Sequence, residues 1–447
     1  HWELEFPEVF FDAEGRRVPD GGFDAVIGNP PWDMVRADGP ARRADARAHT
    51  ASLVRFVRES GTFEARTDGQ VNRYQLFVDR ALAITRPGGR LGLVLPSGAV
   101  ADAGSAPLRH TLFARARVDR VVGFDNTAGT FPIHRSVRFV LMSGTVGERT
   151  QEMACRFGVR DPSELDGAIT VEGAPQPDWF PMRIRPALLT RVSGDDVSIP
   201  DVRAPMDLAI LERAATLFER LGSVDGWNAH FGRELNATED RPLLHDAVGD
   251  VPVFEGKAIE PFTPCLSKVR WWMRTPDASA RLGTRWQRSR LAYRDVASAT
   301  NRVTLIAALL PPRCGSTHTL FCLKTPLAVR HQHLLCALLN SLVVNFLVRQ
   351  RVSTHVTTAI VERLPIPRED QLGPDAEALA ADAAALSSTW NVATYASLNA
   401  RVARAYALSH DEFAHVLSTF PLIDRGERAQ MLRAFAEEGG SSGTQVV

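Results

Sequence analysis

The residues with the clearest potential for chemistry are Asn29, Pro30, Pro31 and Trp32, which follow the apolar stretch at residues 23–28. The side-chain oxygen of Asn29 and the backbone oxygen of Pro30 can together accept both hydrogens of an exocyclic amine. The nitrogen lone pair, otherwise delocalised into the ring, could then attack a sulfonium methyl group. Trp32 would stack on the base, which must leave its duplex to reach such a pocket. The alternative is an ordinary Asn-Pro turn with a packed tryptophan.

The elements that must position this string alternate between strand and helix over the first 145 or so residues, as in an α/β sheet. The predicted elements are strands at 23–28, 90–95, 118–124 and 137–142, and an amphipathic helix at 72–86. The last two strands flank a polar loop and form a hairpin. Because α/β sheets place their ligands at the carboxyl ends of strands, the position of Asn29 favours a functional site. We predict a partial, Rossmann-like sheet.

The rest of the chain is predicted to hold a second domain and a helical end. Residues 149–205 are rich in Pro, Gly and Asp and are predicted to form a connector. Residues 206–370 mix helices with short strands, which is typical of an α+β domain. Residues 371–438 are Ala-rich and predicted to be helical, and 439–447 form a frayed tail. A length of 447 residues with 45% hydrophobic content fits two or three domains.

Charge is unevenly distributed, although the formal net charge is zero. Between Lys268 and Arg302 nine basic residues stand against only Asp277 and Asp295. Trp271, Trp272, Trp286 and Tyr293 are threaded among them. Such a stretch could neutralise phosphates and offer planar rings to bases, although a solvated basic face would look similar. The residues predicted to contact DNA are Lys268, Arg270, Arg285, Arg288, Arg290, Arg294, Arg302, Arg349, Arg351 and His355.

Metal sites, disulfides and membrane spans are not indicated. The five cysteines are scattered without a Cys-x-x-Cys pair, which argues against a disulfide framework and a zinc knuckle. His331, His333 and Cys336 lie in an apolar helical stretch, where packing is the simpler interpretation. No apolar run reaches eighteen residues, and the first residues do not resemble a signal peptide. We therefore predict a cytoplasmic protein with no metal and no membrane partner.

Three segments of the first part resemble a known family. Residues 23–32, 72–95 and 131–142 resemble the fourth to eighth motifs of the Taq-type adenine methyltransferases and the type IIG restriction-modification enzymes. The resemblance implies adenine-N6 methylation of duplex DNA by base flipping, with S-adenosyl-L-methionine as cofactor, in restriction-modification or phage defence. It implies that Trp32 and Phe131 grip the flipped adenine. It assigns Asn29, Pro31 and Phe77 to the cofactor, although Phe77 could equally be a core residue of its helix.

The second domain resembles the target-recognition domain of the same family in three places, at residues 253–259, 293–301 and from 339 to 367. Methyltransferase motifs followed by a recognition domain distinguish DNA enzymes from small methyltransferases that share the Asn-Pro-Pro string. It implies double-stranded DNA as the partner, and it leaves room for other restriction or phage-defence subunits.

One departure from the family concerns the cofactor. The family's cofactor site is a glycine-rich turn upstream of the Asn-Pro-Pro string, whereas only 28 residues precede Asn29 and Gly21-Gly22 is their sole glycine pair. We expect three or so strands of the cofactor half to be absent from this chain, with weak cofactor binding unless another chain supplies them. Residues 1–145 should then form an incomplete sheet with an exposed apolar edge.

Three other functions stay open. The chain could be a DNA-binding specificity module without chemistry of its own. It could also methylate RNA or a protein glutamine, which the large basic second domain disfavours. The third is a nuclease, because Asp250, Glu255 and Lys257 follow the outline of a metal-dependent nuclease, although the gap between Asp250 and Glu255 is short for that motif.

Overall fold

The computed structural model describes residues 1–32, 52, 55–57, 59–61, 63, 72–135, 137–167, 179–297, 301–352 and 355–439. Contacts divide the chain into two compact units, His1–Leu208 and Ala209–Val447. Among the described residues no single helix is long and apolar enough to span a membrane, although one bent helix pair in the second unit passes that test by length and composition.

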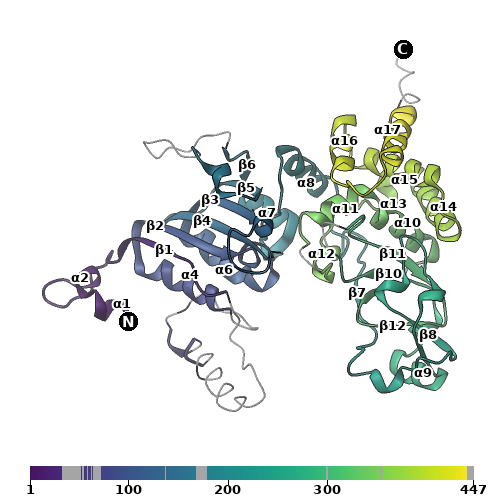
Figure 1. Cartoon of the computed structure of the whole chain (residues 1–447), viewed down its shortest axis with the longest axis horizontal. Coiled ribbons are helices and arrows are strands. Elements are labelled where there is room, and N and C mark those ends of the chain that lie inside the picture. The colour runs from purple at the N-terminus through teal and green to yellow at the C-terminus, as the bar shows by residue number, and fades with distance from the viewer. Residues whose placement is uncertain are drawn as a thin grey trace. The chain divides into compact units, whose positions relative to one another are not determined.

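Unit 1 is built on a six-stranded mixed sheet with the order β1-β2-β4-β3-β5-β6 (Figure 1). Its strands are β1 (Phe23–Gly28), β2 (Thr85–Pro96), β3 (Ala116–Asp125), β4 (Arg138–Val146), β5 (Met153–Val159) and β6 (Met182–Ile184). β1 runs parallel to β2, and β3 and β4 form the predicted antiparallel hairpin. All four strands predicted in the first 145 residues are confirmed, and the α/β fold class with them.

Two helices pack against this sheet and against each other. These are α4 (Arg73–Ile84) and α6 (Ala106–Arg115), which contact β2 and β3 respectively (Figure 1). The predicted helix at 72–86 begins with a capping box between Asn72 and Gln75, which satisfies backbone groups at its start. The helix ends at Ile84, before the Pro-Gly-Gly signal, because Thr85 already enters β2. The shorter helices are α1 (Trp2–Glu5), α2 (Pro7–Phe10), α5 (Gly98–Ala101) and α7 (Pro186–Ser193).

The segment predicted as a connector differs from that expectation. Within 149–205, β5 pairs in parallel with β3, and β6 pairs antiparallel with β5. β5 begins with three buried residues, Met153, Ala154 and Cys155, and then alternates between half-buried and buried positions to Val159. The frequent Pro, Gly and Asp residues fall largely outside these two strands, which is why composition alone indicated a connector.

Unit 2 contains two small sheets. Four antiparallel strands follow the order β11-β10-β13-β7, and three more the order β12-β8-β9. The strands are β7 (Phe231–Gly232), β8 (Val251–Phe254), β9 (Trp271–Met273), β10 (Arg290–Arg294), β11 (Ala307–Leu310), β12 (Gly315–Ser316) and β13 (Leu320–Leu323). β10 is buried at four of its five positions, so the larger sheet forms part of the core.

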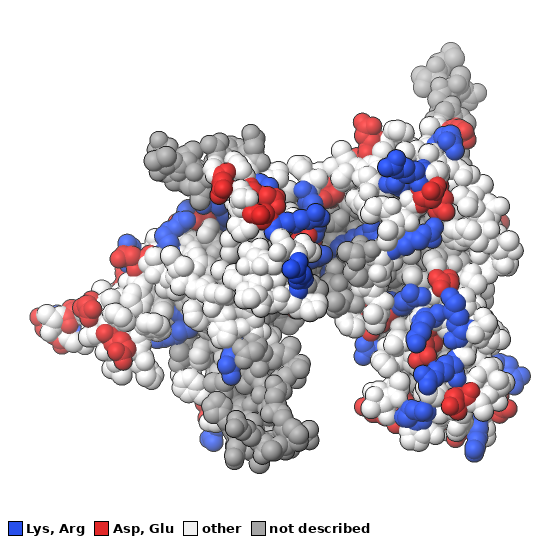
Figure 2. Space-filling view, in the orientation of Figure 1, with Lys and Arg blue, Asp and Glu red and all other residues white. Residues whose placement is uncertain are grey.

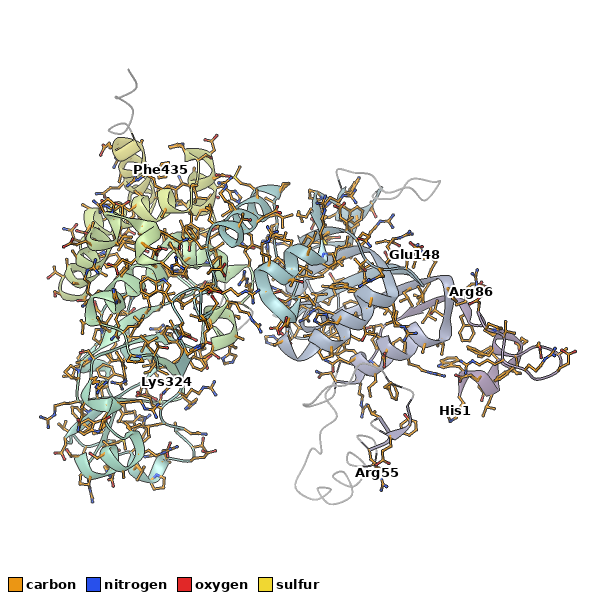
Figure 3. The ribbon with its side chains drawn as sticks, turned by 180° about the vertical axis from the view of Figure 1, so that it is seen from behind. His1, Arg55, Arg86, Glu148, Lys324 and Phe435 are labelled. Carbon is orange, nitrogen blue, oxygen red and sulfur yellow. The ribbon has the colours of Figure 1, made fainter. Side chains whose placement is uncertain are left out.

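The helices of unit 2 enclose a core around one bent pair. The predicted helix at 331–348 is two helices, α10 (Val329–Asn340) and α11 (Leu342–Arg349), which meet at 60°. Ser341 causes the break, because its side chain caps α11 by accepting from the Val344 N–H. The others are α8 (Pro205–Leu217), α9 (Thr275–Leu282), α12 (Thr358–Glu362), α13 (Glu369–Leu372), α14 (Asp375–Ser388), α15 (Val392–Ala405), α16 (His410–Ser418) and α17 (Arg425–Gly439). Phe435 of α17, labelled in Figure 3, packs on Phe413 of α16 with ring centroids 5.2 Å apart.

Candidate functional site

The Asn-Pro-Pro-Trp string lies directly after the carboxyl end of β1, as the sequence predicts. Asn29 and Pro31 are exposed, Pro30 is buried and Trp32 is half-buried. β1 pairs with β2 on one side, and its residue Ile27 leaves 87% of its surface exposed. The exposed apolar character expected at this edge of the sheet is therefore present.

An aromatic cluster surrounds Trp32. Its ring contacts Phe131 edge to face, with centroids 6.1 Å apart, and lies tilted on Phe139 at 6.2 Å. Phe131 meets Phe139 at 4.7 Å, and Phe139 stacks on Phe124 at 4.8 Å. The structure therefore brings together Trp32 and Phe131, the two residues that the sequence assigned to the target base, and adds Phe139, which sequence reasoning missed.

The hairpin between β3 and β4 carries this cluster. Phe124 and Phe139 face each other across the two strands, as do Asp125 and Arg138 at the mouth of the loop. Arg138 forms an ion pair with Asp125 at 3.2 Å and with Asp201 at 2.9 Å. The alternation of strand residues puts Phe139 on the same face as Leu141, which packs against the cluster. Phe139 could have been identified from its place opposite Phe124 in the predicted hairpin.

Phe77 lies close to the other side of the β1 end. It is 36% exposed, so it is not the buried core residue that its helix would also allow. A Cβ atom on Gly28 would come within 2.9 Å of Phe77 Cζ, so only glycine lets this ring lie so close to the strand. A cavity of about 400 Å³ lies here, and Ile27, Phe77 and Arg80 are among its lining residues. An aromatic ring is thus available within reach of the Asn-Pro-Pro string.

The basic residues of unit 2 separate into exposed and internally paired ones. Arg270, Arg285 and Arg288 are exposed, and Arg270 stacks on the Trp271 ring at 4.4 Å from its centroid. Lys268 is exposed but paired with Glu260, and Arg302 is half-exposed and paired with Glu427. In Figure 2 basic side chains gather over the part of unit 2 that carries β8 and α9, with acidic ones among them.

Arg290, which the sequence predicts to contact DNA, is buried and paired inside unit 2. Its side chain is only 6% exposed and forms a bidentate ion pair with Glu234, with both N···O distances 2.6 Å. Burial alone would raise the pKa of Glu234, but hydrogen bonds and charge from Arg290 outweigh it and hold this pKa below its usual value. Lys324, labelled in Figure 3, adds a weaker attraction. The pair is a core element of unit 2.

Four further residues that the sequence predicts to contact DNA have partners within unit 2 or buried guanidinium atoms. Arg349 donates to the Thr419 carbonyl and stacks on Phe420, and Arg294 donates to the Ile259 carbonyl. His355 pairs with the buried carboxylate of Asp295. Burial lowers the pKa of Arg351 to about 10, and neighbouring arginines add repulsion. The three arginines are buried or half-buried, whereas His355 keeps 55% of its side chain exposed. Composition therefore overstated the number of arginines that face solvent.

The aromatic residues of the basic stretch are also mostly internal. Trp271, Trp286 and Tyr293 are 8%, 2% and 0% exposed, so they offer no open ring face to a base. Trp272 is half-buried. Trp271 in β9 and Trp286 in the turn before β10 pack in one hydrophobic cluster, and Tyr293 lies in the buried strand β10. Large apolar side chains gain most from such burial.

The nuclease outline does not form a metal site within the part of the chain that the structure describes. There, no three His, Cys, Asp or Glu side chains are grouped as metal ligands would be. Asp250 instead accepts hydrogen bonds from the backbone and the hydroxyl of Thr275, at the start of α9. His331 is paired with Glu369, and Cys336 is buried within α10.

Comparison with protein families decides the assignment of the first part. Residues 1–131, which include β1, the Asn-Pro-Pro-Trp string, α4 and Phe131, match the model of the Eco57I restriction-modification methylase family. The match covers less than a third of the chain, and it confirms the resemblance inferred from the sequence for this first part. A search of curated proteins found no match to this chain.

Solved structures of restriction-modification enzymes resemble this chain at low identity. The type IIL enzyme MmeI, in complex with DNA, has 12% identity and a TM-score of 0.44, with coverage of 94% of this chain and 55% of that one. The type IIG endonuclease BpuSI has 13% identity and a TM-score of 0.35, with coverage of 93% of this chain and 54% of that one. A nuclease-deletion mutant of the type ISP enzyme LlaGI, in complex with a DNA substrate mimic, has 10% identity and a TM-score of 0.46. The match covers 82% of this chain and 35% of that one. The chain thus spans about a third to just over half of the length of these proteins.

Proposed function

We propose that this chain is the DNA-facing part of an adenine-N6 DNA methyltransferase of a restriction-modification or phage-defence system. The observation that carries the proposal is the Asn-Pro-Pro-Trp string at the end of β1, with Trp32 set in an aromatic cluster beside Phe131. The match to the Eco57I methylases covers both. Double-stranded DNA is the proposed partner, and other subunits of such a system are compatible with it.

The amine of the target adenine is activated by two acceptors. Asn29 is exposed, so its side-chain oxygen can accept one amine hydrogen. The Pro30 carbonyl accepts the other, and the two bonds draw the amine nitrogen away from conjugation with the ring. The nitrogen lone pair then points at the methyl donor, and the proton that the product nitrogen loses passes to solvent at this exposed edge.

The flipped base stacks on one face of Trp32 and meets the edge of Phe131. A base held between two parallel rings needs about 7 Å between their planes, twice an ordinary van der Waals separation. The two rings lie 6.1 Å apart at 72° to each other, so they do not form such a slot. The geometry instead suits one stacked contact and one edge contact, both favourable for aromatic groups.

S-adenosyl-L-methionine, when bound, supplies an activated methyl group on a sulfonium sulfur. The residues near the β1 end fit such a group in part. Phe77 has an accessible ring beside Gly28, suited to stacking on an adenine, and Pro31 is exposed next to Asn29. We assign Asn29, Pro31 and Phe77 to the cofactor side of the site.

A methyl-transfer assay tests the proposal. The protein is incubated with tritiated S-adenosyl-L-methionine and unmethylated plasmid DNA, total RNA or a protein mixture, and the modified nucleoside is identified by mass spectrometry. N6-methyladenine in the plasmid alone supports the proposal. Duplex binding without transfer would instead indicate a specificity module, and label in RNA or in glutamine would point to the other methyltransferase classes.

DNA contacts in unit 2 are predicted for the exposed arginines. Replacing Arg285 and Arg288 with Ala, with Arg290 kept, should weaken binding to all duplexes alike and reduce the log–log salt slope by about one unit per lost phosphate contact. Fluorescence anisotropy with a labelled duplex at several salt concentrations measures this slope. Arg330→Ala is a matched control, because Arg330 is exposed but paired with Glu369. An unchanged salt slope in the double variant would mean that these arginines are solvated and do not contact DNA.

A further inference from the structure

We propose that Asn126 is a positioning residue for the target base, because its side chain fixes Phe131 in the aromatic cluster. The inference rests on the proposed function and deepens it. Asn126 has 0% of its surface exposed, so it does not touch the base itself. It follows β3 directly, in the loop that returns to β4.

The carboxamide of Asn126 binds both backbone groups of Phe131. The Phe131 N–H donates to Asn126 Oδ1 at 3.0 Å, and Asn126 Nδ2 donates to the Phe131 carbonyl at 3.2 Å. A longer bond of 3.5 Å joins Nδ2 to the carbonyl of Ile133. An amide side chain is the shortest group that offers an acceptor and a donor at this spacing. The loop backbone at Phe131 is thus held from inside the protein.

Other contacts hold the ends of this loop but not Phe131. Asp125 accepts from Arg203 at 3.0 Å and pairs with Arg138 at the mouth of the hairpin. Arg135 donates to the Thr127 carbonyl at 3.0 Å. The Phe131 carbonyl also accepts from the Ile133 N–H, which is a bond local to the loop tip. Among the described residues, Asn126 is therefore the one whose side chain connects the Phe131 backbone to the core.

The position of the Phe131 ring follows from this clamp. Phe131 is only half-buried, and its ring contacts the rings of Phe139 and Trp32, with centroid distances of 4.7 Å and 6.1 Å. Without the clamp the loop tip would sample other conformations, and the edge contact on the base would have to be ordered during the reaction. A contact that is already ordered before the reaction lowers the entropic cost of the step that uses it. Here that step is the capture of the flipped base.

The test uses Asn126→Asp in the complete protein. The aspartate keeps the shape and the acceptor for the Phe131 N–H, but it loses the donor and sets an oxygen against two carbonyls. We expect duplex affinity to be unchanged and single-turnover methyl transfer to fall by about 10-fold or more. A duplex with 2-aminopurine at the methylated adenine, mapped beforehand with the wild-type protein, should show less fluorescence gain, because fewer bases are held outside the helix.

A double-mutant cycle separates positioning from general damage. If Asn126 acts through Phe131, Asn126→Asp added to Phe131→Ala should cost no further rate. Thr127→Ala, an exposed neighbour in the same loop, is the matched control and should leave the rate and the fluorescence unchanged. Additive losses in the cycle, or a wild-type rate and fluorescence gain in Asn126→Asp, would overturn the inference.

A readout that needs no methyl transfer distinguishes this inference from the proposed function. With 4-fluorophenylalanine at position 131, ¹⁹F NMR should give one sharp resonance in the otherwise wild-type protein. Asn126→Asp should shift and broaden it. If the wild-type protein transferred no methyl group, the proposed function would fail, while this spectrum would still decide whether Asn126 holds the ring.

Discussion

Asn29→Ala should lower the rate of methyl transfer to DNA by about 100-fold or more, as loss of a preorganised polar group in a reaction site commonly does. The side chain stands exposed at the end of β1, and its oxygen is the acceptor assigned to one amine hydrogen. Its loss leaves the amine nitrogen conjugated with the ring. Single-turnover transfer from tritiated S-adenosyl-L-methionine to plasmid DNA measures the effect.

The same variant should bind duplex DNA normally, because phosphate contacts supply most of the affinity of such proteins and we propose that these contacts lie in unit 2. Asn391→Ala is the matched control. Asn391 is an exposed asparagine that caps α15, so its loss costs some stability and no chemistry. Trp32→Ala should show the pattern of Asn29→Ala. Adenine methylation at the wild-type rate in Asn29→Ala would exclude the mechanism.

Arg290→Ala should reduce the free energy of unfolding of unit 2 by about 3–5 kcal/mol, because it leaves the buried carboxylate of Glu234 without its partner. The side chain of Glu234 is only 4% exposed, and it would retain the Ser316 hydroxyl at 2.8 Å and the weaker attraction of Lys324. Urea unfolding followed by circular dichroism and tryptophan fluorescence measures the change.

Lys268→Ala provides the comparison for Arg290→Ala. The Lys268–Glu260 pair is about half-exposed on both sides, so its loss should cost no more than about 1 kcal/mol.

Acidification should change the stability of Arg290→Ala and of the wild type differently. The depressed pKa of Glu234 contributes stability above its unfolded pKa, and this contribution is lost as pH falls through the folded pKa. A variant without Arg290 should therefore lose less stability in acid. Equal urea midpoints for Arg290→Ala and the wild type would refute the structural role.

The strands of unit 1 and the place of Asn29 could be predicted because their signals are local. A short apolar run followed by a Pro-Pro turn indicates a strand that ends where Asn29 begins, and the structure has β1 at Phe23–Gly28. The sequence also predicted that this strand is buried, which is wrong: β1 is an edge strand and none of its residues is buried. The same locality explains the α4 prediction. Periodicity identifies the helix, whereas its end at Ile84 depends on pairing of Thr85 with Phe23.

The roles of Arg290 and Asn126 could not be predicted because they depend on a distant partner and on the conformation of a loop, and the role of Phe139 could be inferred only from the register of the predicted hairpin. Arg290 looks like any residue of a basic stretch until it meets Glu234, 56 positions away in the chain. Phe139 joins the cluster through its register opposite Phe124, and Asn126 through three bonds across a loop. Composition reports that these residues exist, while only tertiary structure reports which of them face inward.

The contacts of the bent α10–α11 pair with the C-terminal helices bear on where unit 2 could be cut and transferred to another protein. Asn399 of α15 accepts from the Leu342 N–H at 2.7 Å, and Tyr395 of the same helix donates to the Asn340 carbonyl. A cut near residue 370, where the sequence suggests a domain border, would remove these partners from an apolar helix pair. A graft that begins before α8 and retains the helices through α17 would keep these contacts.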